Sequence, residues 1–357
     1  MYSRNGDACW CGDLPGRAIV VSRRNFGKLA LGAVPAAQLL MQNEAAAQPP
    51  QGRGPGGPPP KPNSNFGGVQ IGVITYSFRQ GVTAQDLIPV ITKLGISEVE
   101  IMSNHAEALA GAPAGPGFGG GGRGRGQMTP EQQAAARAAA DAARAELEKW
   151  RAGVSMDTYK GIRKQFDDAG IDLRILCYNL NGNVKDSELD YSFQMAQALG
   201  VKAISSSSTV TIARRVAPFA EKYKMLWAGH GHDAVDDPEQ FATLESYEKI
   251  MSFGKYIGVN LDIGHFTAAG YDAVDYIKKH HDRISNLHIK DRFRNPPGGR
   301  GANVRWGEGQ TPIKAVLNLM KAEKYPFPAN IEYEYQGTDS VIEVAKCLEY
   351  CRDILLG

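Results

Sequence analysis

The sequence predicts an α/β protein built as a (β/α)8 barrel, a closed ring of parallel strands with a helix after each strand. From Val69 onward, short apolar runs alternate with amphipathic segments of helical period, which is typical of βα units and a parallel sheet. The unit repeats eight times up to Leu355, the number that a barrel of this kind needs. The segment 75–78 (TYSF) follows the first strand and lacks the glycine-rich phosphate fingerprint of the main alternative, an open doubly wound sheet.

Each element follows from the period of its apolar residues and from the turn residues that bound it. The predicted strands are Val69–Tyr76, Glu98–Met102, Leu173–Tyr178, Lys202–Ser206, Met225–Gly229, Val259–Ile263, Ile284–Ile289 and Ala329–Tyr335. The predicted helices are Thr83–Leu94, Thr129–Trp150, Met156–Ala169, Ser187–Leu199, Ile212–Tyr223, Pro238–Phe253, Ala273–His280, Pro312–Lys321 and Ser340–Leu355. Functional residues of such a barrel are expected at the C-terminal ends of the strands.

Residues 1–47 are predicted to be an N-terminal extension followed by an export signal. Arg23 and Arg24 precede a short apolar run that ends near Ala45–Ala47, which is the order of a cleavable leader. The paired arginines, with a polar residue and Phe26 after them, resemble a twin-arginine leader. We therefore expect an exported protein, periplasmic or extracellular, with the twin-arginine export machinery as a partner; an ordinary secretory leader is the alternative.

The apolar run of the leader is too short for a bilayer of ~30 Å hydrocarbon, so no stable membrane insertion is expected. Residues 1–21 lie before the signal, and a start at Val20 or Val21 would explain them. Residues 48–68 form a Pro/Gly-rich linker, and residues 69–357 form the barrel, with a Gly-rich insert at 111–126. The insert is predicted to be either a lid over the substrate or an expansion without a role.

Charge and cysteine content exclude several classes of function. The chain has 40 Lys and Arg against 38 Asp and Glu, and the charges form no block of one sign, so no nucleic-acid partner is expected. Five cysteines are too few for a disulfide scaffold of this length. An oligomer is left open.

Histidines and carboxylates gather at the predicted strand ends. The chain has 7 histidines, and four of them follow or end strands five to seven: His230, His232, His265 and His288. The carboxylates at strands two, six and eight are Glu100, Asp262, Glu332 and Glu334. A carboxylate is costly inside a barrel without a cation, and mixed nitrogen and oxygen ligands suit Mn, Co, Zn, Fe or Mg better than Ca. One divalent metal ion is therefore predicted; polar groups hydrogen-bonding around the barrel mouth are the alternative.

Three motifs in order resemble those of the sugar phosphate isomerase/epimerase family, the xylose isomerase-like TIM barrels. They are LDIGH at 261–265, LHIKDR at 287–292 and IEYE at 331–334, and the resemblance covers about Val69 to Leu355. It implies a divalent metal bound by Asp262, His288 and Glu332, and a substrate contact by His265.

The fifth strand departs from the family pattern. His230-Gly231-His232 stands where epimerases of the family place a metal-binding, catalytic Glu. His230 can still bind metal, but the pair of opposed glutamates that moves a proton between two faces of a sugar is incomplete. This argues against a plain ketose 3-epimerase and leaves proton abstraction next to a carbonyl intact.

The predicted activity is a metal-dependent isomerase or epimerase reaction on a small carbohydrate, through an enediolate. Glu332 or Glu334 is the first candidate base, with His265 or His232 second. Contacts to substrate are expected from the side chains His232, His265, Lys290, Asp291, Arg292 and Glu100, although the strand-seven residues among them could equally form a solvated rim. The alternatives are a lyase or hydratase acting on 3-keto-glycosides, a non-catalytic sugar-binding barrel and, ranked lowest, a metal-dependent endonuclease of the same fold.

Overall fold

The computed structural model describes residues 61–115 and 129–357. All described residues belong to one compact unit, which spans 59–357. The predicted export signal, most of the linker and the greater part of the Gly-rich insert lie outside the described residues. No helix in the described ranges combines the length and the apolar character needed to cross a bilayer.

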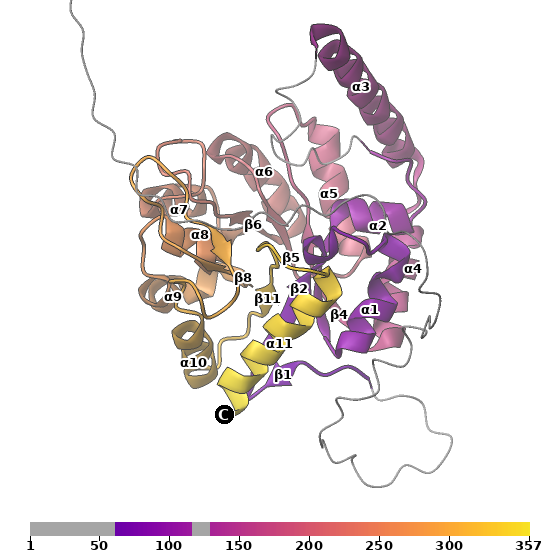
Figure 1. The fold of residues 1–357 in the computed structure, drawn as a ribbon. Coiled ribbons are helices and arrows are strands. Elements are labelled where there is room, and N and C mark those ends of the chain that lie inside the picture. The colour runs from indigo at the N-terminus through magenta and orange to yellow at the C-terminus, as the bar shows by residue number, and fades with distance from the viewer. Residues whose placement is uncertain (1–60, 116–128) are drawn as a thin grey trace, which may run out of the picture. The chain divides into compact units, whose positions relative to one another are not determined.

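The described unit is a closed barrel of eight parallel strands (Figure 1), as the sequence predicts. The order around the ring is β2-β11-β8-β7-β6-β5-β4-β3, and pairing of β2 with β3 closes it. The strands are β2 (Val69–Ile74), β3 (Glu98–Met102), β4 (Asp172–Cys177), β5 (Ala203–Ser206), β6 (Leu226–His230), β7 (Ile257–Asp262), β8 (Ile284–Ile289) and β11 (Ala329–Ile331). Three short strands add to these: β1 (Asn65–Phe66), antiparallel to β2, and the pair β9 (Asp291–Arg292) and β10 (Asn303–Val304).

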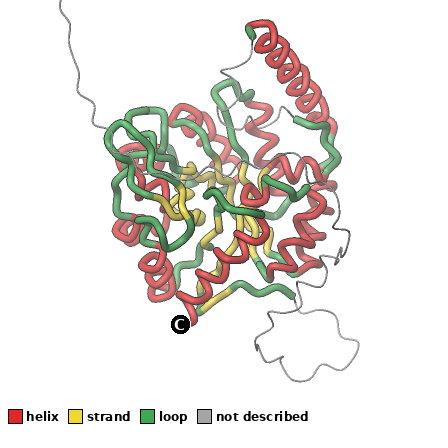
Figure 2. The backbone as a smooth tube through the Cα atoms, in the orientation of Figure 1, coloured by secondary structure: helices red, strands yellow, loops and turns green. Residues whose placement is uncertain are grey.

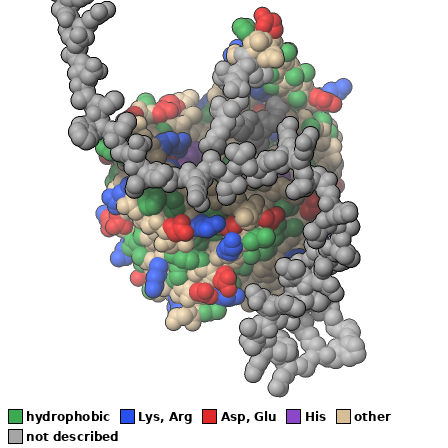
Figure 3. Space-filling view, in the orientation of Figure 1, with side chains coloured by type: hydrophobic (Ala, Val, Ile, Leu, Met, Phe, Trp, Pro, Cys, Tyr) green, Lys and Arg blue, Asp and Glu red, His purple; other side chains and the backbone are tan. Residues whose placement is uncertain are grey.

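Helices surround the strands (Figure 2). They are α1 (Leu87–Leu94), α2 (Ser103–Leu109), α3 (Pro130–Gly153), α4 (Met156–Ala169), α5 (Asp186–Ala198), α6 (Val210–Tyr223), α7 (Leu244–Met251), α8 (Ile263–Ala268), α9 (Ala273–His280), α10 (Ile313–Glu323) and α11 (Ser340–Leu356), with 3-10 turns η1 (Thr75–Phe78), η2 (Ala84–Asp86) and η4 (His281–Arg283). Several helices begin where the sequence supplies a capping side chain, such as Thr129 of α3 and Asp339 of α11. The face in Figure 3 mixes acidic and basic side chains.

Several predicted element bounds differ from those of the structure. The helix predicted from Pro238 begins at Leu244, because Thr243 and Ser246 form a capping box there. The eighth strand ends at Ile331 rather than Tyr335, and the first ends at Ile74. The short helices α2 and α8 start directly after β3 and β7, where no turn residue separates strand from helix.

The barrel interior contains buried polar side chains as well as apolar ones. Glu98 is fully buried and accepts a hydrogen bond from Asn330 Nδ2 at 2.8 Å. Gly72 on the neighbouring strand makes room for it, because a Cβ at that position would collide with the Glu98 carboxylate. Burial, reinforced by Glu100, raises the pKa of Glu98 well above its usual value. The barrel therefore holds a carboxyl group that favours the protonated form.

Candidate active site

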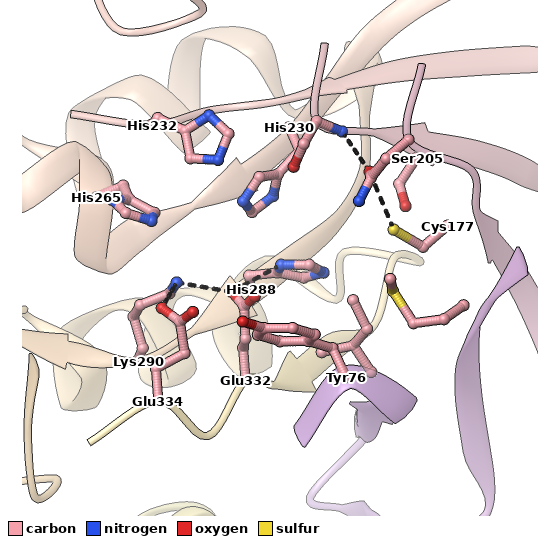
Figure 4. A pocket seen from close by; sticks show the side chains of 14 residues that line it. Tyr76, Cys177, Ser205, His230, His232, His265, His288, Lys290, Glu332 and Glu334 are labelled. Carbon is pink, nitrogen blue, oxygen red and sulfur yellow. Dashed lines mark hydrogen bonds and ion pairs between the residues drawn. The ribbon is translucent and has the colours of Figure 1, made fainter. Parts of the chain in front are cut away.

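A cavity of about 200 Å³ opens at the C-terminal ends of the strands (Figure 4). Its lining comes from all eight β-strands of the barrel or the segments that directly follow them, the arrangement that the barrel rule predicts. The lining side chains are Ile74, Tyr76, Met102, Cys177, Asn179, Ser205, Ser207, His230, His232, His265, His288, Lys290, Glu332 and Glu334.

Four side chains at one end of this cavity are arranged as a metal site would require. His230 ends β6, Asp262 ends β7, His288 lies on β8 and Glu332 directly follows β11. One potential ligand atom from each lies within 4.8 Å of those of the others. Asp262 and His288 are partners in the β7–β8 register, so neighbouring strands present them at one level. The structure thus brings together the four residues predicted as metal ligands.

The hydrogen bonds of His230 prepare it to bind a cation. Its Nδ1 lies 2.5 Å from Asn260 Oδ1, an acceptor, so Nδ1 carries the proton and Nε2 keeps its lone pair. Burial, and next the proximity of His288, lowers the pKa of His230 well below its usual value. A neutral imidazole with a free lone pair is the form that binds metals.

His288 is held between two carboxylates. Its Nε2 lies 2.7 Å from Glu100 Oε2, and its Nδ1 lies 3.1 Å from Glu332 Oε2. Although burial opposes charge on the ring, Glu100 and Glu332 raise the pKa of His288 well above its usual value. A carboxylate behind a histidine is the common supporting arrangement in metal sites, because it orients the ring and increases its basicity.

Glu100 therefore has a different place from the one predicted. It is fully buried beneath the cavity and does not contribute to its lining. Its oxygens accept hydrogen bonds from Ser205 Oγ, from Asn286 Nδ2 at 2.7 Å and from His288 Nε2. Because these donors occupy the carboxylate, Glu100 supports His288 rather than contacting a substrate.

Asp262 supplies the observation that tests whether a cation fits. Its Oδ1 accepts a 2.6 Å hydrogen bond from the His265 amide at the start of α8. Its Oδ2 is buried and has no hydrogen-bond partner among the described residues; its close neighbour is the Lys290 ammonium, whose Nζ forms an ion pair with it at 3.0 Å. Burial raises the pKa of Asp262 to about 7 despite the nearby Lys290 ammonium. A buried carboxylate oxygen without a hydrogen bond, next to two imidazoles and a second carboxylate, fits a divalent metal ion.

Lys290 enters the cavity from the residue after β8 and is almost fully buried. Its Nζ lies 3.0 Å from Asp262 Oδ2, 2.8 Å from Glu332 Oε2 and 2.6 Å from Glu334 Oε2. Burial opposes its charge, but these three carboxylates raise the pKa of Lys290 well above its usual value. Lys290 is therefore a cation of the site itself and not part of a solvated rim.

Asp291 and Arg292, predicted to contact substrate, are turned to other partners and do not line the cavity. The Asp291 carboxylate accepts hydrogen bonds from the backbone amides of Gly307, Gly309 and Thr311 at 2.8, 2.9 and 3.1 Å. It therefore holds the long loop after β8. The prediction missed this role because the loop amides lie far along the chain from Asp291.

Arg292 instead belongs to a buried network around Asp233. Its Nη2 lies 3.2 Å from Asp233 Oδ2 and its Nη1 lies 2.5 Å from His265 Nδ1. Asp233 also pairs with Arg300, and its Oδ1 lies 3.0 Å from His265 Nδ1. The network holds the His265 ring through its Nδ1 atom.

His232 and His265, which the sequence analysis expects to contact substrate, both line the cavity. Together with His230 they form a second group whose potential ligand atoms lie within 4.8 Å of one another. Burial, and next the Lys290 ammonium, lowers the pKa of both His232 and His265. Neutral imidazoles at this wall can donate or accept hydrogen bonds with hydroxyl groups.

The opposite wall of the cavity was missed by the sequence analysis. It is formed by the small apolar cluster of Ile74, Met102 and Cys177, against which Tyr76 packs. Asn179, Ser205 and Ser207 add polar groups beside it. These residues also follow or end strands, but their side chains are common in barrel interiors and so give no signal by type alone.

A model of a known protein family matches more than half of the chain. The family described as the xylose isomerase-like TIM barrel matches residues 133–351. The chain belongs to this family. Among curated proteins, none matches the chain significantly.

Several solved structures share the fold of this xylose isomerase-like barrel. A probable 3-DHS dehydratase, AsbF, from Bacillus anthracis is 13% identical, with a TM-score of 0.55 over 79% of this chain and 98% of the other. A sugar phosphate isomerase/epimerase from Parabacteroides distasonis is 17% identical, with a TM-score of 0.52 over 81% and 96%. IolI, solved with a bound zinc atom, is 16% identical, with a TM-score of 0.53 over 80% and 98%. At these identities the likeness concerns the fold.

Proposed function

We propose that this protein is a divalent-metal-dependent isomerase or epimerase that removes a proton next to the carbonyl of a sugar or keto-sugar. The observation that carries the proposal is the cluster of His230, Asp262, His288 and Glu332 at four adjacent strand ends. The cluster faces a cavity whose lining also includes a carboxylate outside the cluster, that of Glu334. A cation site beside a base is the arrangement needed for this chemistry.

A bound metal would polarise the carbonyl and stabilise the negative charge that develops on its oxygen when the proton leaves. Glu334 is the base that the geometry favours, because it lines the cavity yet lies outside the four-residue cluster. Its partner Lys290, whose Nζ lies 2.6 Å from Glu334 Oε2, orients it. His232 and His265, on the other wall, are positioned to hold hydroxyl groups and are the second choice as bases.

The neutral His230 limits what can follow proton removal. A family epimerase would have a second carboxylate there to return the proton from the opposite face. Because an imidazole stands in its place, two outcomes are favoured: the proton returns to the face from which it was removed, or a β-substituent leaves. A lyase or hydratase reaction on 3-keto-glycosides is therefore the second candidate, and the structural neighbour described as a probable dehydratase is consistent with it.

The substrate class depends on where the protein is located. The paired arginines at positions 23 and 24 support export, so free sugars, glycosides or their keto derivatives are proposed in preference to sugar phosphates. Among macromolecules, the twin-arginine export machinery is the proposed partner.

The test is solvent exchange in deuterated water. Metal-loaded protein is incubated with a panel of keto-sugars and keto-glycosides, and deuterium next to the carbonyl is measured by NMR and mass spectrometry. The proposal expects exchange with at least one compound, lost in Glu334→Gln and kept in Glu349→Gln, an exposed acid on α11. An unsaturated product identifies the lyase alternative.

Two outcomes would contradict the proposal. Saturable sugar binding without exchange in any compound would indicate a sugar-binding barrel. Cleavage of an abasic DNA duplex in a parallel assay, without exchange, would indicate the endonuclease alternative.

A further inference from the structure

Lys290 makes contacts that a substrate-binding lysine does not need. Its Nζ lies against Asp262 Oδ2 and Glu332 Oε2, at 3.0 and 2.8 Å. The first is the oxygen without a hydrogen bond, and the second is the oxygen that faces His288 Nδ1 at 3.1 Å. These are the carboxylate oxygens that a metal bound to the four-residue cluster would use. Figure 4 shows Lys290 beside Glu332 and Glu334 at that side of the cavity.

The fold holds the Lys290 stem in this position. Gly264, in the first turn of α8, packs against it, and a Cβ on Gly264 would collide with both the side chain and the carbonyl of Lys290. The ammonium is almost fully buried, so water does not screen its charge from the carboxylates. Its place is therefore a property of the packing and not of a flexible surface chain.

Charge balance indicates what happens when a second cation enters. Asp262 and Glu332 together carry two negative charges, which a divalent ion neutralises. Lys290 would then be an excess positive charge in a buried site, which is unfavourable. Glu334, at 2.6 Å from Nζ, supplies the third carboxylate that restores the balance.

We propose that Lys290 and a divalent metal ion are alternative cations for Asp262 and Glu332, and that Glu334 accepts Lys290 when the metal binds. Lys290 then weakens metal binding and Glu334 strengthens it, although neither is a ligand. The Lys290–Glu334 pair is a device that sets the metal affinity. This inference rests on the metal site of the proposed function.

The test measures the affinity for Co²⁺ and Zn²⁺ directly, by competition with a chelating dye, in full-length protein without any substrate. Lys290→Met is expected to bind the metals about tenfold more tightly, because a buried competing charge is removed. Glu334→Gln is expected to bind them about tenfold more weakly, because Lys290 loses its alternative partner. The double variant should resemble Lys290→Met, since without the lysine the loss of Glu334 has no such effect.

The matched control is Lys279→Met, which removes an exposed lysine paired with Asp275 on α9 and should leave the affinity unchanged. Unchanged affinity in both single cavity variants would overturn the inference while leaving the metal site in place. Absence of metal binding in the wild type would instead overturn the proposed function. If Lys290→Met does not fold, Glu334→Gln decides alone: weaker binding supports the inference, and equal or tighter binding contradicts it.

Discussion

Glu100 Oε2 and His288 Nε2 lie 2.7 Å apart inside the barrel, below the cavity floor. The contact gives Nε2 a carboxylate acceptor and directs Nδ1 toward the other members of the metal cluster, of which Glu332 Oε2 lies 3.1 Å away. A carboxylate that never reaches the cavity thereby controls which nitrogen the cavity receives. The two residues lie on strands that are far apart in the sequence, β3 and β8.

Glu100→Gln should therefore weaken metal binding about 10- to 100-fold while the barrel stays folded, because the amide orients His288 less well and lacks the negative charge. Metal content after dialysis and circular dichroism measure the two effects. Ser205→Ala is the control, since it removes another donor to Glu100 without touching His288. Equal metal affinity in Glu100→Gln would show that the contact does not support the ligand.

Removal of a cluster member should lower metal content directly. The variants are His230→Ala, Asp262→Ala, His288→Ala and Glu332→Ala, each of which removes one of four proposed ligands. His105→Ala is the control, because His105 lies on α2, outside the four-residue cluster, and contacts Thr75 Oγ1 instead. His230→Glu should retain metal. Full stoichiometric metal in His230→Ala would show that the fourth ligand is another residue.

Asp291→Ala should destabilise the protein by about 3 kcal/mol, because three backbone amides, of which that of Thr311 is buried, lose their charged acceptor. The loop after β8 should also become sensitive to limited proteolysis. Chemical denaturation and mass spectrometry of the fragments test this. A stable variant with a raised KM alone would restore the substrate-contact role predicted from the sequence.

Glu98→Gln should stabilise the barrel increasingly as the pH rises. Burial raises the pKa of Glu98 in the folded state, so above about pH 4.3 the unfolded chain releases a proton that the folded chain retains. Stability from this group is thus lost with rising pH, and the amide removes that loss. Urea denaturation of the wild type and the variant at pH 5 and pH 8, in the presence of EDTA, measures the free energy of unfolding. The variant should exceed the wild type by more at pH 8 than at pH 5. A gain that is independent of pH would contradict the raised pKa.

Export can be tested by changing both Arg23 and Arg24 to Lys, which should retain the protein in the cytoplasm if the leader is of the twin-arginine type. Cell fractionation and the N-terminal sequence of the wild type measure the location and the cleavage. Wild-type protein of full length in the cytosol would remove the leader interpretation and bring sugar phosphates back as substrates.

The strands could be predicted because they follow from local patterns, and the resemblance of three motifs to a known family implied Asp262, His288 and Glu332 as cluster residues. Strand runs such as Ile284–Ile289 are apolar and bounded, and the barrel rule then places His288 and Asp262 at a common end. What could not be predicted depends on contacts between distant residues. The position of Lys290 requires the absence of a side chain at Gly264, and the role of Asp291 requires a loop that returns to it.

Element ends were least predictable where tertiary contacts outweigh local preference. The predicted eighth strand, Ala329–Tyr335, contains both Glu332 and Glu334, yet the observed strand ends before both. They still lie together at the cavity because Lys290 draws both carboxylates to its ammonium.

The most direct test of the metal site is anomalous diffraction from crystals of the protein loaded with Zn²⁺ or Co²⁺, measured on both sides of the absorption edge. The account predicts one strong peak within bonding distance of His230, Asp262, His288 and Glu332. A peak that His230 does not contact would contradict the assignment of the fourth ligand, and no peak at these strand ends in metal-loaded crystals would contradict the metal site itself.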